Sequence, residues 1–372
     1  MKILLIEPFF SGSHRDWAQG LVRHSAHDIR ILSMPGKHWK WRMQGGAIYL
    51  ARRFRELDFS PDLVLATDML ALGNFLALTR DRLVGVPTAV YFHENQFAYP
   101  QSPRSSPAEQ VRDQQYAFMN YTSALCADAL FFNSDFNRRG FLNGCGALLR
   151  RLPDHRELET VQELEERASV LPLGLELAEL DAHRPPPSRR NSTPRILWNH
   201  RWEYDKNPEE FLQALEVLQA RGAEFELVVL GEGDAAAALR AGTLPESRIA
   251  HAGYAAGREE YARLLWSTDI IPVTSRHEFF GASVVEAVYC ENRPLLPRRL
   301  SYPELLPEEL LQGCYYGTFE ELTELLGSAL ENIRETGPES RGRPIVERYD
   351  WRKLIGVYDS ALAAVRFERG GN

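Results

Sequence analysis

Long apolar runs, paired cysteines and an overall positive charge are all missing from this sequence of 372 residues. No window approaches the roughly 20 apolar residues of a membrane-spanning helix. The N-terminal apolar stretch ends at Glu7, too soon for a signal peptide. The four cysteines lack CxxC spacing, which argues against a zinc site and a disulfide framework. These absences predict a cytoplasmic protein without membrane contact.

The net charge of −8 argues against nucleic acid as a partner, but the charge is unevenly distributed. Residues 1–153 carry 18 Lys and Arg against 13 Asp and Glu, a balance of +5. Only this first part of the chain is therefore expected to face a polyanion.

Short apolar runs alternate with amphipathic segments, the pattern of parallel sheets with crossover helices. The predicted strands are Ile3–Glu7, Ile29–Met34, Leu63–Ala66, Ala89–His93, Leu130–Asn133, Val170–Leu173, Ile196–Trp198, Glu226–Leu230, Ile249–Ala252, Ile270–Val273 and Pro294–Leu296. The predicted helices are Ala47–Leu57, Glu109–Cys126, Pro208–Arg221, Arg258–Trp266, Ser283–Cys290, Phe319–Glu335 and Trp351–Phe367.

A proline-rich stretch interrupts this alternation, which then restarts. The fold class is therefore α/β, with two Rossmann-like domains and a cleft between them. We expect a first domain over 1–182, a linker over 183–194, a second domain over 195–350 and a C-terminal helix over 351–372 that packs back toward the first domain.

The strongest local motif follows the strand that ends at Val273. Glu278 and Glu286 are eight residues apart, and Gly281, Ala282 and Ser283 lie between them. If a helix starts near Ala282, its free N–H groups and dipole form an anion site suited to a diphosphate. The two carboxylates can accept hydrogen bonds from sugar hydroxyls. The alternative is a helix with ordinary capping and one buried ion pair.

A second motif lies at the end of the first strand of the second domain. Arg201 and Lys206 flank a turn there, where two cations could neutralise a leaving pyrophosphate. Paired cations near a turn are also common on any protein surface. Asn199 and Phe279, from the same two segments, complete the donor-binding residues predicted here.

In the first domain, polar residues gather after two strands. Gly12 follows the first strand, and Ser13, His14, Arg15 and Asp16 are predicted on the same loop. The run His93, Glu94, Asn95 and Gln96 follows the fourth strand. We expect Gly12 to bind the donor and the other residues to bind the acceptor, with His93 bonding a sugar hydroxyl or assisting proton transfer. The alternatives are a tight turn at Gly12 and a structural histidine.

A basic aromatic stretch suggests RNA. Residues 37–55 contain six Lys and Arg and no acid, and two tryptophans interleave the charges. The predicted acceptor-binding residues here are Lys37, Trp39, Lys40, Trp41 and Arg42. The alternative is a solvated helix face with two tryptophans packed at a domain edge.

The second half resembles the retaining nucleotide-sugar glycosyltransferases of GT-B fold, whose hallmark is an E-x7-E pair, matched by Glu278 and Glu286. The resemblance assigns Arg201 and Lys206 to the donor diphosphate and Glu286 to the ribose. It also places Gly231, Gly253 and Tyr254 on loops that wall the nucleotide pocket. No DxD motif stands out, so we expect no metal and no other cofactor.

Two runs in the first half, Ser11–Trp17 and Tyr91–Pro100, look like the tRNA-queuosine α-mannosyltransferases. This resemblance implies transfer of mannose from GDP-mannose to queuosine at the wobble position of tRNA-Asp, with retention. Two alternatives remain: another nucleotide sugar with a small-molecule, lipid or polysaccharide acceptor, and a non-catalytic nucleotide-sugar-binding protein.

Overall fold

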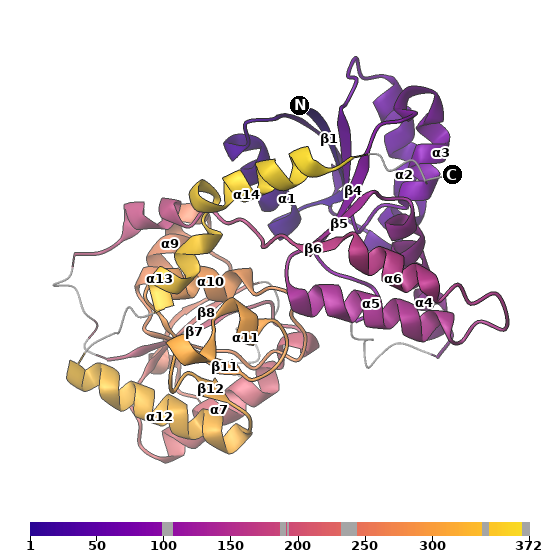
Figure 1. The fold of residues 1–372 in the computed structure, drawn as a ribbon. Coiled ribbons are helices and arrows are strands. Elements are labelled where there is room, and N and C mark those ends of the chain that lie inside the picture. Colours follow the sequence, from indigo (N-terminus) through magenta and orange to yellow (C-terminus); the bar gives the residue numbers. More distant parts are fainter. Residues whose placement is uncertain (99–106, 187–190, 192, 232–243, 337–341, 367–372) are drawn as a thin grey trace. The chain divides into compact units, whose positions relative to one another are not determined.

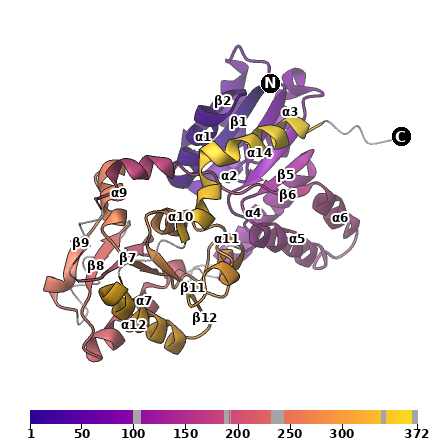
Figure 2. The same cartoon turned by 60° about the vertical axis from the view of Figure 1, so that its left-hand side comes forward.

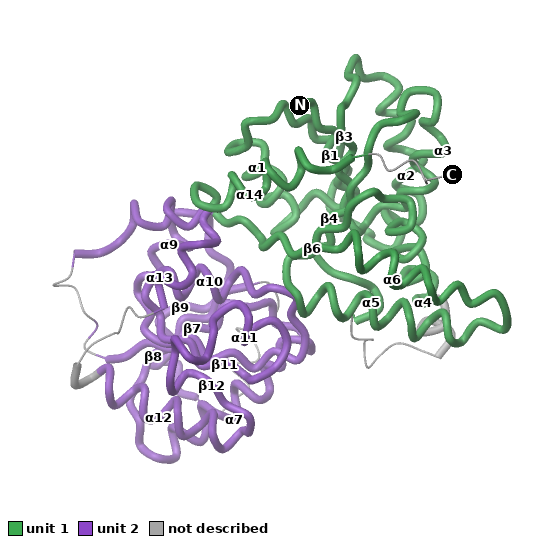
Figure 3. Tube along the Cα trace, viewed as in Figure 1, with its two compact units in different colours: residues 1–175, 351–372 green, residues 176–350 purple. Residues whose placement is uncertain are grey.

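The computed structural model describes residues 1–98, 107–186, 191, 193–231, 244–336 and 342–366, with the backbone alone at 107–112 and 334–336. The chain forms two compact units (Figure 3). Unit 1 comprises Met1–Leu175 and Trp351–Asn372, and unit 2 comprises Glu176–Asp350. Among the described residues, no helix has the length and apolar character needed to cross a membrane.

Unit 1 is built on a parallel sheet of strand order β2-β1-β3-β4-β5-β6. Its strands are β1 (Lys2–Phe10), β2 (Asp28–Pro35), β3 (Leu63–Thr67), β4 (Thr88–Phe92), β5 (Ala129–Phe132) and β6 (Ala168–Val170). Its helices are α1 (Gly12–His24), α2 (Trp39–Arg55), α3 (Leu72–Leu83), α4 (Pro107–Leu125), α5 (Asp135–Leu149), α6 (Glu159–Glu166) and α14 (Trp351–Ala364). The strand order reverses between β1 and β3, and ligands of such sheets bind beyond the carboxyl ends of the strands at this point.

The C-terminal helix α14 lies beside α1 in unit 1 (Figures 1 and 2). Trp17 Nε1 donates to the Tyr358 hydroxyl at 3.0 Å, and that hydroxyl donates to the carbonyl oxygen of Pro172 at 2.8 Å. The fully buried Trp351 indole occupies the space that a side chain at Gly20 or Gly174 would need. The far end of the chain therefore completes the core of the first unit.

Unit 2 contains a second parallel sheet, of order β12-β11-β10-β7-β8-β9. Its strands are β7 (Arg195–Asn199), β8 (Glu226–Leu230), β9 (Ile249–Ala252), β10 (Ile270–Pro272), β11 (Arg293–Pro297) and β12 (Tyr315–Tyr316). Its α-helices are α7 (Pro208–Ala220), α9 (Arg258–Trp266), α10 (Ala282–Tyr289), α11 (Tyr302–Leu305), α12 (Phe319–Thr336) and α13 (Arg343–Val346). Its 3₁₀ turns are η1 (Ala178–His183), η2 (Tyr204–Lys206), η3 (Glu246–Arg248), η4 (Glu308–Leu310) and η6 (Glu347–Tyr349).

The predicted parallel α/β architecture is confirmed, with differences at element ends. The predicted strand Val170–Leu173 lies at Ala168–Val170, and the two-residue strand β12 was not predicted. The helix predicted at Ala47–Leu57 begins at Trp39, so it includes the aromatic part of the basic stretch.

The boundary predicted at residue 182 differs from the division into units. Residues 176–182 belong to unit 2 because η1 is fastened there: Trp266 Nε1 donates to the Leu180 carbonyl oxygen at 2.8 Å, and Arg343 pairs with Asp181 at 2.7 Å. Residues 187–190 and 192 of the predicted linker lie outside the described residues, as do the last six residues of the predicted C-terminal segment.

Candidate active site

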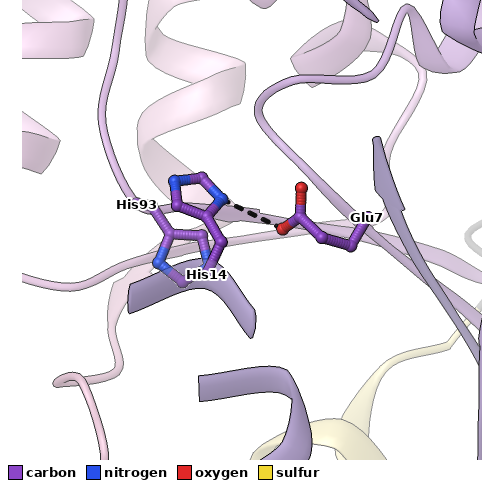
Figure 4. A group of neighbouring side chains, drawn as sticks. All are labelled: Glu7, His14 and His93. Atoms are coloured by element: carbon purple, nitrogen blue, oxygen red, sulfur yellow. Dashed lines mark hydrogen bonds and ion pairs between the residues drawn. The ribbon is translucent and has the colours of Figure 1, made fainter. Parts of the chain in front are cut away.

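Three polar side chains lie buried together at the carboxyl edge of the unit 1 sheet (Figure 4). Glu7 comes from β1, His14 from the first turn of α1, and His93 directly follows β4. Glu7 Oε2 accepts a hydrogen bond from His14 Nδ1 at 3.0 Å, and Glu7 Oε1 accepts one from the backbone N–H of Phe9 at 2.7 Å. The His14 and His93 rings lie 4.1 Å apart between centroids.

The two histidines carry different charges. Burial by itself would lower the pKa of His14, but the Glu7 carboxylate outweighs burial and raises this pKa to about 9. Burial, helped by the positive charge on His14, holds the pKa of His93 well below its ordinary value. At neutral pH His14 is therefore a cation and His93 an uncharged imidazole.

Buried polar atoms without a partner occur on His93 and at the end of the adjacent strand β3. The backbone N–H of His93 donates to Asp68 Oδ1 at 2.9 Å. Among the described residues, His93 Nε2, Asp68 Oδ2 and Thr67 Oγ1 are buried without a hydrogen-bond partner. Buried polar atoms in folded proteins are nearly always bonded, so a set of unpaired ones is a place where a ligand can bind.

Asparagines hold the loop that carries His93. Asn95 Nδ2 donates to Asn137 Oδ1 at 2.8 Å, while Asn95 Oδ1 accepts from the N–H groups of residues 97 and 98. Asn133 Nδ2 donates to the His93 carbonyl oxygen at 2.7 Å. Gln96 Nε2 donates to Glu94 Oε1 at 3.1 Å. The amide of Asn95 is thus engaged within the fold, whereas Glu94 and Gln96 are half-buried.

The residues that follow Gly12 form a helix, and the predicted loop is wrong. Gly12 has φ +51° and begins α1. A side chain at this glycine would meet open space, so its backbone conformation is what favours glycine there. The helical twist turns His14 inward, whereas Ser13, Arg15 and Asp16 are exposed. Of the four predicted neighbours, only His14 joins the buried cluster.

Helix α2 separates the predicted RNA-binding residues onto two faces. Trp39 is half-buried and packs against Tyr116 at 5.3 Å between ring centroids, whereas Trp41 is 60% exposed. Lys40 forms an ion pair with Asp113 at 2.7 Å. Exposed Lys37 precedes the helix, and Arg42 Nε donates to the Pro35 carbonyl oxygen at 3.0 Å. The alternative prediction, that both tryptophans pack at a domain edge, is therefore correct for Trp39 and wrong for Trp41.

In unit 2, Lys206 and Glu278 form a largely buried ion pair. Lys206 Nζ lies 3.2 Å from Glu278 Oε2 and 3.3 Å from Asp205 Oδ2, and it donates to the His277 carbonyl oxygen at 3.0 Å. Burial favours the neutral form of Glu278, but the adjacent ammonium outweighs burial and lowers the pKa of Glu278 to about 2. The carboxylate therefore stays ionised, ready to accept hydrogen bonds.

The helix start predicted near Ala282 is confirmed. Gly281, with φ +105°, precedes α10, and the N–H groups of Phe279 and Phe280 donate to Glu278 Oε1. Phe279 is itself buried. Ser283 Oγ lies 3.2 Å from His200 Nδ1.

Two features beside this helix start concern His200. Burial lowers the pKa of His200 to about 4, and its Nε2 lacks a partner among the described residues. A side chain at Gly231, whose φ is +111°, would collide with the His200 carbonyl oxygen. Gly231 thus allows the close approach to the His200 backbone, and its predicted place beside the donor site stays a prediction.

Glu286, the second carboxylate of the pair, is bound within a hydrogen-bonded network. Arg258 donates to its Oε1 at 2.7 Å and the Tyr261 hydroxyl donates to its Oε2 at 2.6 Å. Asn199 Nδ2 in turn donates to the Tyr261 hydroxyl at 2.8 Å. A predicted donor-binding residue on β7 is therefore linked to Glu286 through α9.

The remaining predicted donor residues are more open. Arg201 is half exposed and pairs with Glu203 at 3.1 Å. Tyr254 is 74% exposed, and a side chain at the preceding Gly253, with φ +140°, would meet open space.

Several polar residues of these clusters were not identified from the sequence. They are Glu7, Asp68, His200, Arg258, Tyr261 and His277. Glu7 offered a signal, because a carboxylate within a buried parallel strand needs a partner. The others follow from contacts across the fold that no local pattern reveals.

Glu7, His14 and His93 also offer potential metal-binding atoms within 4.8 Å of one another. A metal requires deprotonated ligands, however, and His14 Nδ1 shares a proton with Glu7. The cluster in this form is an ion pair. The expectation that no metal is needed stays a prediction.

Comparison with known proteins gives two family matches. Residues 2–175 match the family described as "tRNA-queuosine alpha-mannosyltransferase N-terminal", and residues 181–310 match "Glycosyl transferases group 1". A Drosophila melanogaster protein named tRNA-queuosine alpha-mannosyltransferase is 32% identical over 334 residues, which cover 87% of this chain and 85% of that protein.

More distant similarities extend to other transferases. A Mycobacterium tuberculosis GDP-mannose-dependent alpha-(1-6)-phosphatidylinositol dimannoside mannosyltransferase is 28% identical over 257 residues, 66% of this chain and 59% of that protein. Among solved structures, Anabaena HepE in complex with UDP has a TM-score of 0.68 at 15% identity, covering 98% of this chain and 100% of that one. Sucrose-phosphate synthase of Thermosynechococcus elongatus has a TM-score of 0.69 at 14% identity, with the same coverage. These two structures show the fold alone.

Proposed function

The chain belongs to the tRNA-queuosine alpha-mannosyltransferase family, and on this premise we propose that it transfers mannose from GDP-mannose to queuosine at the wobble position of tRNA. The observation that carries the proposal is the 32% identity over 87% of the chain, because that similarity extends through both units. GDP-mannose as donor is supported by the name of the mycobacterial relative. A tRNA acceptor favours a cytoplasmic location.

In the proposed reaction, the bond between mannose C1 and the β-phosphate oxygen breaks and GDP leaves. A hydroxyl of the queuosine cyclopentene-diol bonds to C1 on the same face, and its proton passes to the departing phosphate. Lys206 and Arg201, with the N-terminal end of α10, stabilise the charge that develops on the diphosphate. Where other transferases use a metal ion, these cations of the chain supply the positive charge.

The two glutamates have separate roles in this proposal. Glu278 is ionised and rigidly held, so it can orient the sugar ring by accepting hydrogen bonds from its hydroxyls. Glu286 binds the nucleotide ribose, together with Asn199 and Tyr261, whose hydroxyl already contacts both side chains. The other predicted donor residues line the nucleotide.

On unit 1, His93 contacts the acceptor diol through Nε2. An uncharged imidazole can donate or accept a hydrogen bond there, and the buried site contains no bonding partner for this atom among the described residues. Lys37, Trp41 and Arg42 contact the RNA around the modified base. The exposed Trp41 ring offers a stacking surface, and the cations neutralise phosphates.

Radiolabelled GDP-mannose, incubated with tRNA-Asp that carries or lacks queuosine at two salt concentrations, tests this function. We expect label only in the queuosine-containing tRNA, decreasing as salt rises. Absence of label, with donor hydrolysis lost in Glu278→Ala, would contradict the RNA acceptor and retain a glycosyltransferase. Full turnover by Glu278→Ala, or donor binding without any transfer or hydrolysis, would contradict the proposed donor chemistry.

A further inference from the structure

Glu7 lies in the core strand β1, where packing gives no reason for a carboxylate side chain. Its neighbours Leu4, Leu5 and Ile6 are fully buried, and so is Glu7 itself. Removing a carboxylate from water is costly, and a buried ion pair rarely stabilises a fold more than apolar residues of similar volume. The position of Glu7 is therefore better explained by what it does to its partner than by packing.

Both carboxylate oxygens of Glu7 are committed. The N–H of Phe9 fixes Oε1, which leaves Oε2 pointing at His14 Nδ1. This hydrogen bond fixes the plane of the His14 ring and decides that a proton resides on Nδ1. Asp68 and Glu94 are further carboxyl groups that raise the pKa of His14, while burial raises the pKa of the Asp68 carboxyl itself well above its ordinary value.

The His14 ring in turn forms one wall of the His93 site. The two ring planes are inclined at 35° with centroids 4.1 Å apart, while Trp17 and Tyr91 contact His93 edge-on at 4.7 and 4.8 Å. The two aromatic rings are rigid, because Trp17 stacks on Tyr91 at 4.4 Å and both hydrogen-bond to Tyr358. His14 is the wall whose ring is oriented by its hydrogen bond to Glu7.

We propose that Glu7 is a positioning residue, which holds the His14 ring against His93 and thereby aims the unpaired His93 Nε2 at the acceptor hydroxyl. This inference rests on the proposed function for the identity of the acceptor. The dependence of His93 on Glu7 through His14 is a structural claim and does not rest on the proposed function. Glu7 itself touches neither donor nor acceptor.

The variant Glu7→Gln provides the test. The amide can still accept from the Phe9 N–H, but its NH₂ group then faces His14 Nδ1, which can accept only as a neutral ring protonated on Nε2. We expect kcat for queuosine-containing tRNA to fall about 10- to 100-fold while KM stays within about twofold, because the reacting groups are misaligned and the RNA contacts are retained. Glu7→Asp, which keeps the charge on a shorter arm, should fall between wild type and Glu7→Gln.

Ring ¹⁵N NMR of the histidines gives a readout that does not require activity. In the wild type at neutral pH, we expect both nitrogens of His14 to be protonated. In Glu7→Gln we expect a single neutral tautomer and displaced His93 signals. The matched control is Asp359→Asn, which weakens the partly buried His27–Asp359 pair, 3.9 Å apart, elsewhere in unit 1. This control should leave kcat and the His93 signals unchanged.

Different failures have different meanings. Unchanged kcat or unchanged His93 signals in a folded Glu7→Gln would overturn the positioning role. Stoichiometric zinc in the purified wild type, lost in Glu7→Gln, would overturn it in favour of a metal site. If the wild type transfers nothing to tRNA, the proposed function fails, while the NMR comparison still decides whether Glu7 acts on His93. If Glu7→Gln fails to fold, Glu7→Asp carries both measurements.

Discussion

Lys206 Nζ lies 3.2 Å from Glu278 Oε2, inside unit 2, and neither side chain can be changed without altering the other. The ammonium keeps the glutamate ionised, and the glutamate compensates for the burial of the ammonium. The first carboxylate of the E-x7-E pair thus depends on a cation 72 positions earlier in the chain.

Lys206→Met should abolish most transfer and also destabilise unit 2. Losing one preorganised charge that faces the leaving group lowers kcat about 10²- to 10³-fold, and the stranded carboxylate costs about 3–5 kcal/mol of folding free energy. The double variant Lys206→Met with Glu278→Gln should recover much of the melting temperature without recovering activity. Arg263→Gln, which breaks an exposed ion pair on α9, is the control. Recovery of kcat in the double variant would argue that Lys206 is purely structural.

Glu286→Gln should weaken donor binding more than it slows chemistry. The charged hydrogen bonds that Glu286 would make to the ribose are worth about 1.5–3 kcal/mol, so the donor dissociation constant should rise roughly 10- to 100-fold. Isothermal titration with GDP measures this change directly. The matched control is Glu226→Gln, which removes a carboxylate paired with Arg195 at 2.7 Å on the same sheet. Equal affinities for the two variants would exclude Glu286 from the nucleotide site.

The two tryptophans of α2 should behave in opposite ways. Trp41→Ala should lower tRNA affinity about 5- to 150-fold, as expected for one lost base stack, with little effect on melting temperature. Trp39→Ala should lower the melting temperature instead, because that ring packs on Tyr116. Gel-shift titration and thermal unfolding distinguish the two effects.

The cations around α2 should also differ in their contribution to RNA binding. Lys37→Ala should reduce the slope of log affinity against log salt by about one. Lys40→Ala should change it less, since Asp113 already neutralises that charge. An identical salt slope for the two variants would contradict a role for the ion pair.

Base should destabilise unit 1, whereas acid should destabilise both units, because burial lowers the pKa of His93 in unit 1 as well. His200 and His277 have pKa values lowered by burial to about 4 in the fold against 6.5 in the unfolded chain, so their contribution is complete above pH 6.5 and is lost as the pH falls toward 4. Glu278, about 2 against 4.5, extends this loss as the pH falls from 4.5 to 2. His14, with its pKa raised to about 9, contributes fully below pH 6.5 and loses its contribution as the pH rises to 9.

Hydrogen exchange at several pH values can assign these effects to the units. His14→Gln should flatten the alkaline side of the stability profile, and only in unit 1. His200→Gln should flatten the acidic side in unit 2. If either variant changes the pH dependence of stability in both units, the assignment of His14 to unit 1 effects and His200 to unit 2 effects is wrong.

Gly20→Ala should destabilise unit 1 by about 1–3 kcal/mol, although alanine normally favours a helix. The reason is the fully buried Trp351 indole, which occupies the position of the new methyl group. Gly356→Ala on α14, where a side chain meets open space, is the control. Thermal unfolding of the two variants should move in opposite directions.

Most strands were predictable because they are short runs bounded by polar residues or glycine, and Glu226–Leu230 and Ile249–Ala252 even have the predicted ends. Polar residues gave two wrong predictions. Glu7 was taken as the end of a strand that runs on to Phe10, because a buried carboxylate is costly and its partner lies seven residues away. The segment after Gly12 resembles a loop by composition, yet it begins α1.

The candidate site was predictable where motifs are local and unpredictable where it depends on packing. The helix start at Ala282 and the placement of His93 after β4 follow from nearby residues. The link from Asn199 through Tyr261 to Glu286 joins β7, α9 and α10, and no spacing in the chain encodes it.

The discontinuity of unit 1 has a consequence for biosynthesis. A ribosome delivers residues 1–175 and then the whole of unit 2 before it releases Trp351 and Tyr358. During that interval the surface at Gly20 and Gly174 lacks the Trp351 indole that covers it in the complete fold. Trp17 and Tyr91 likewise lack their hydrogen-bond partner Tyr358. The second unit can therefore finish folding before the first. A nascent chain that stops before residue 351 exposes the apolar surface that α14 would cover, and chaperones and proteases can bind it.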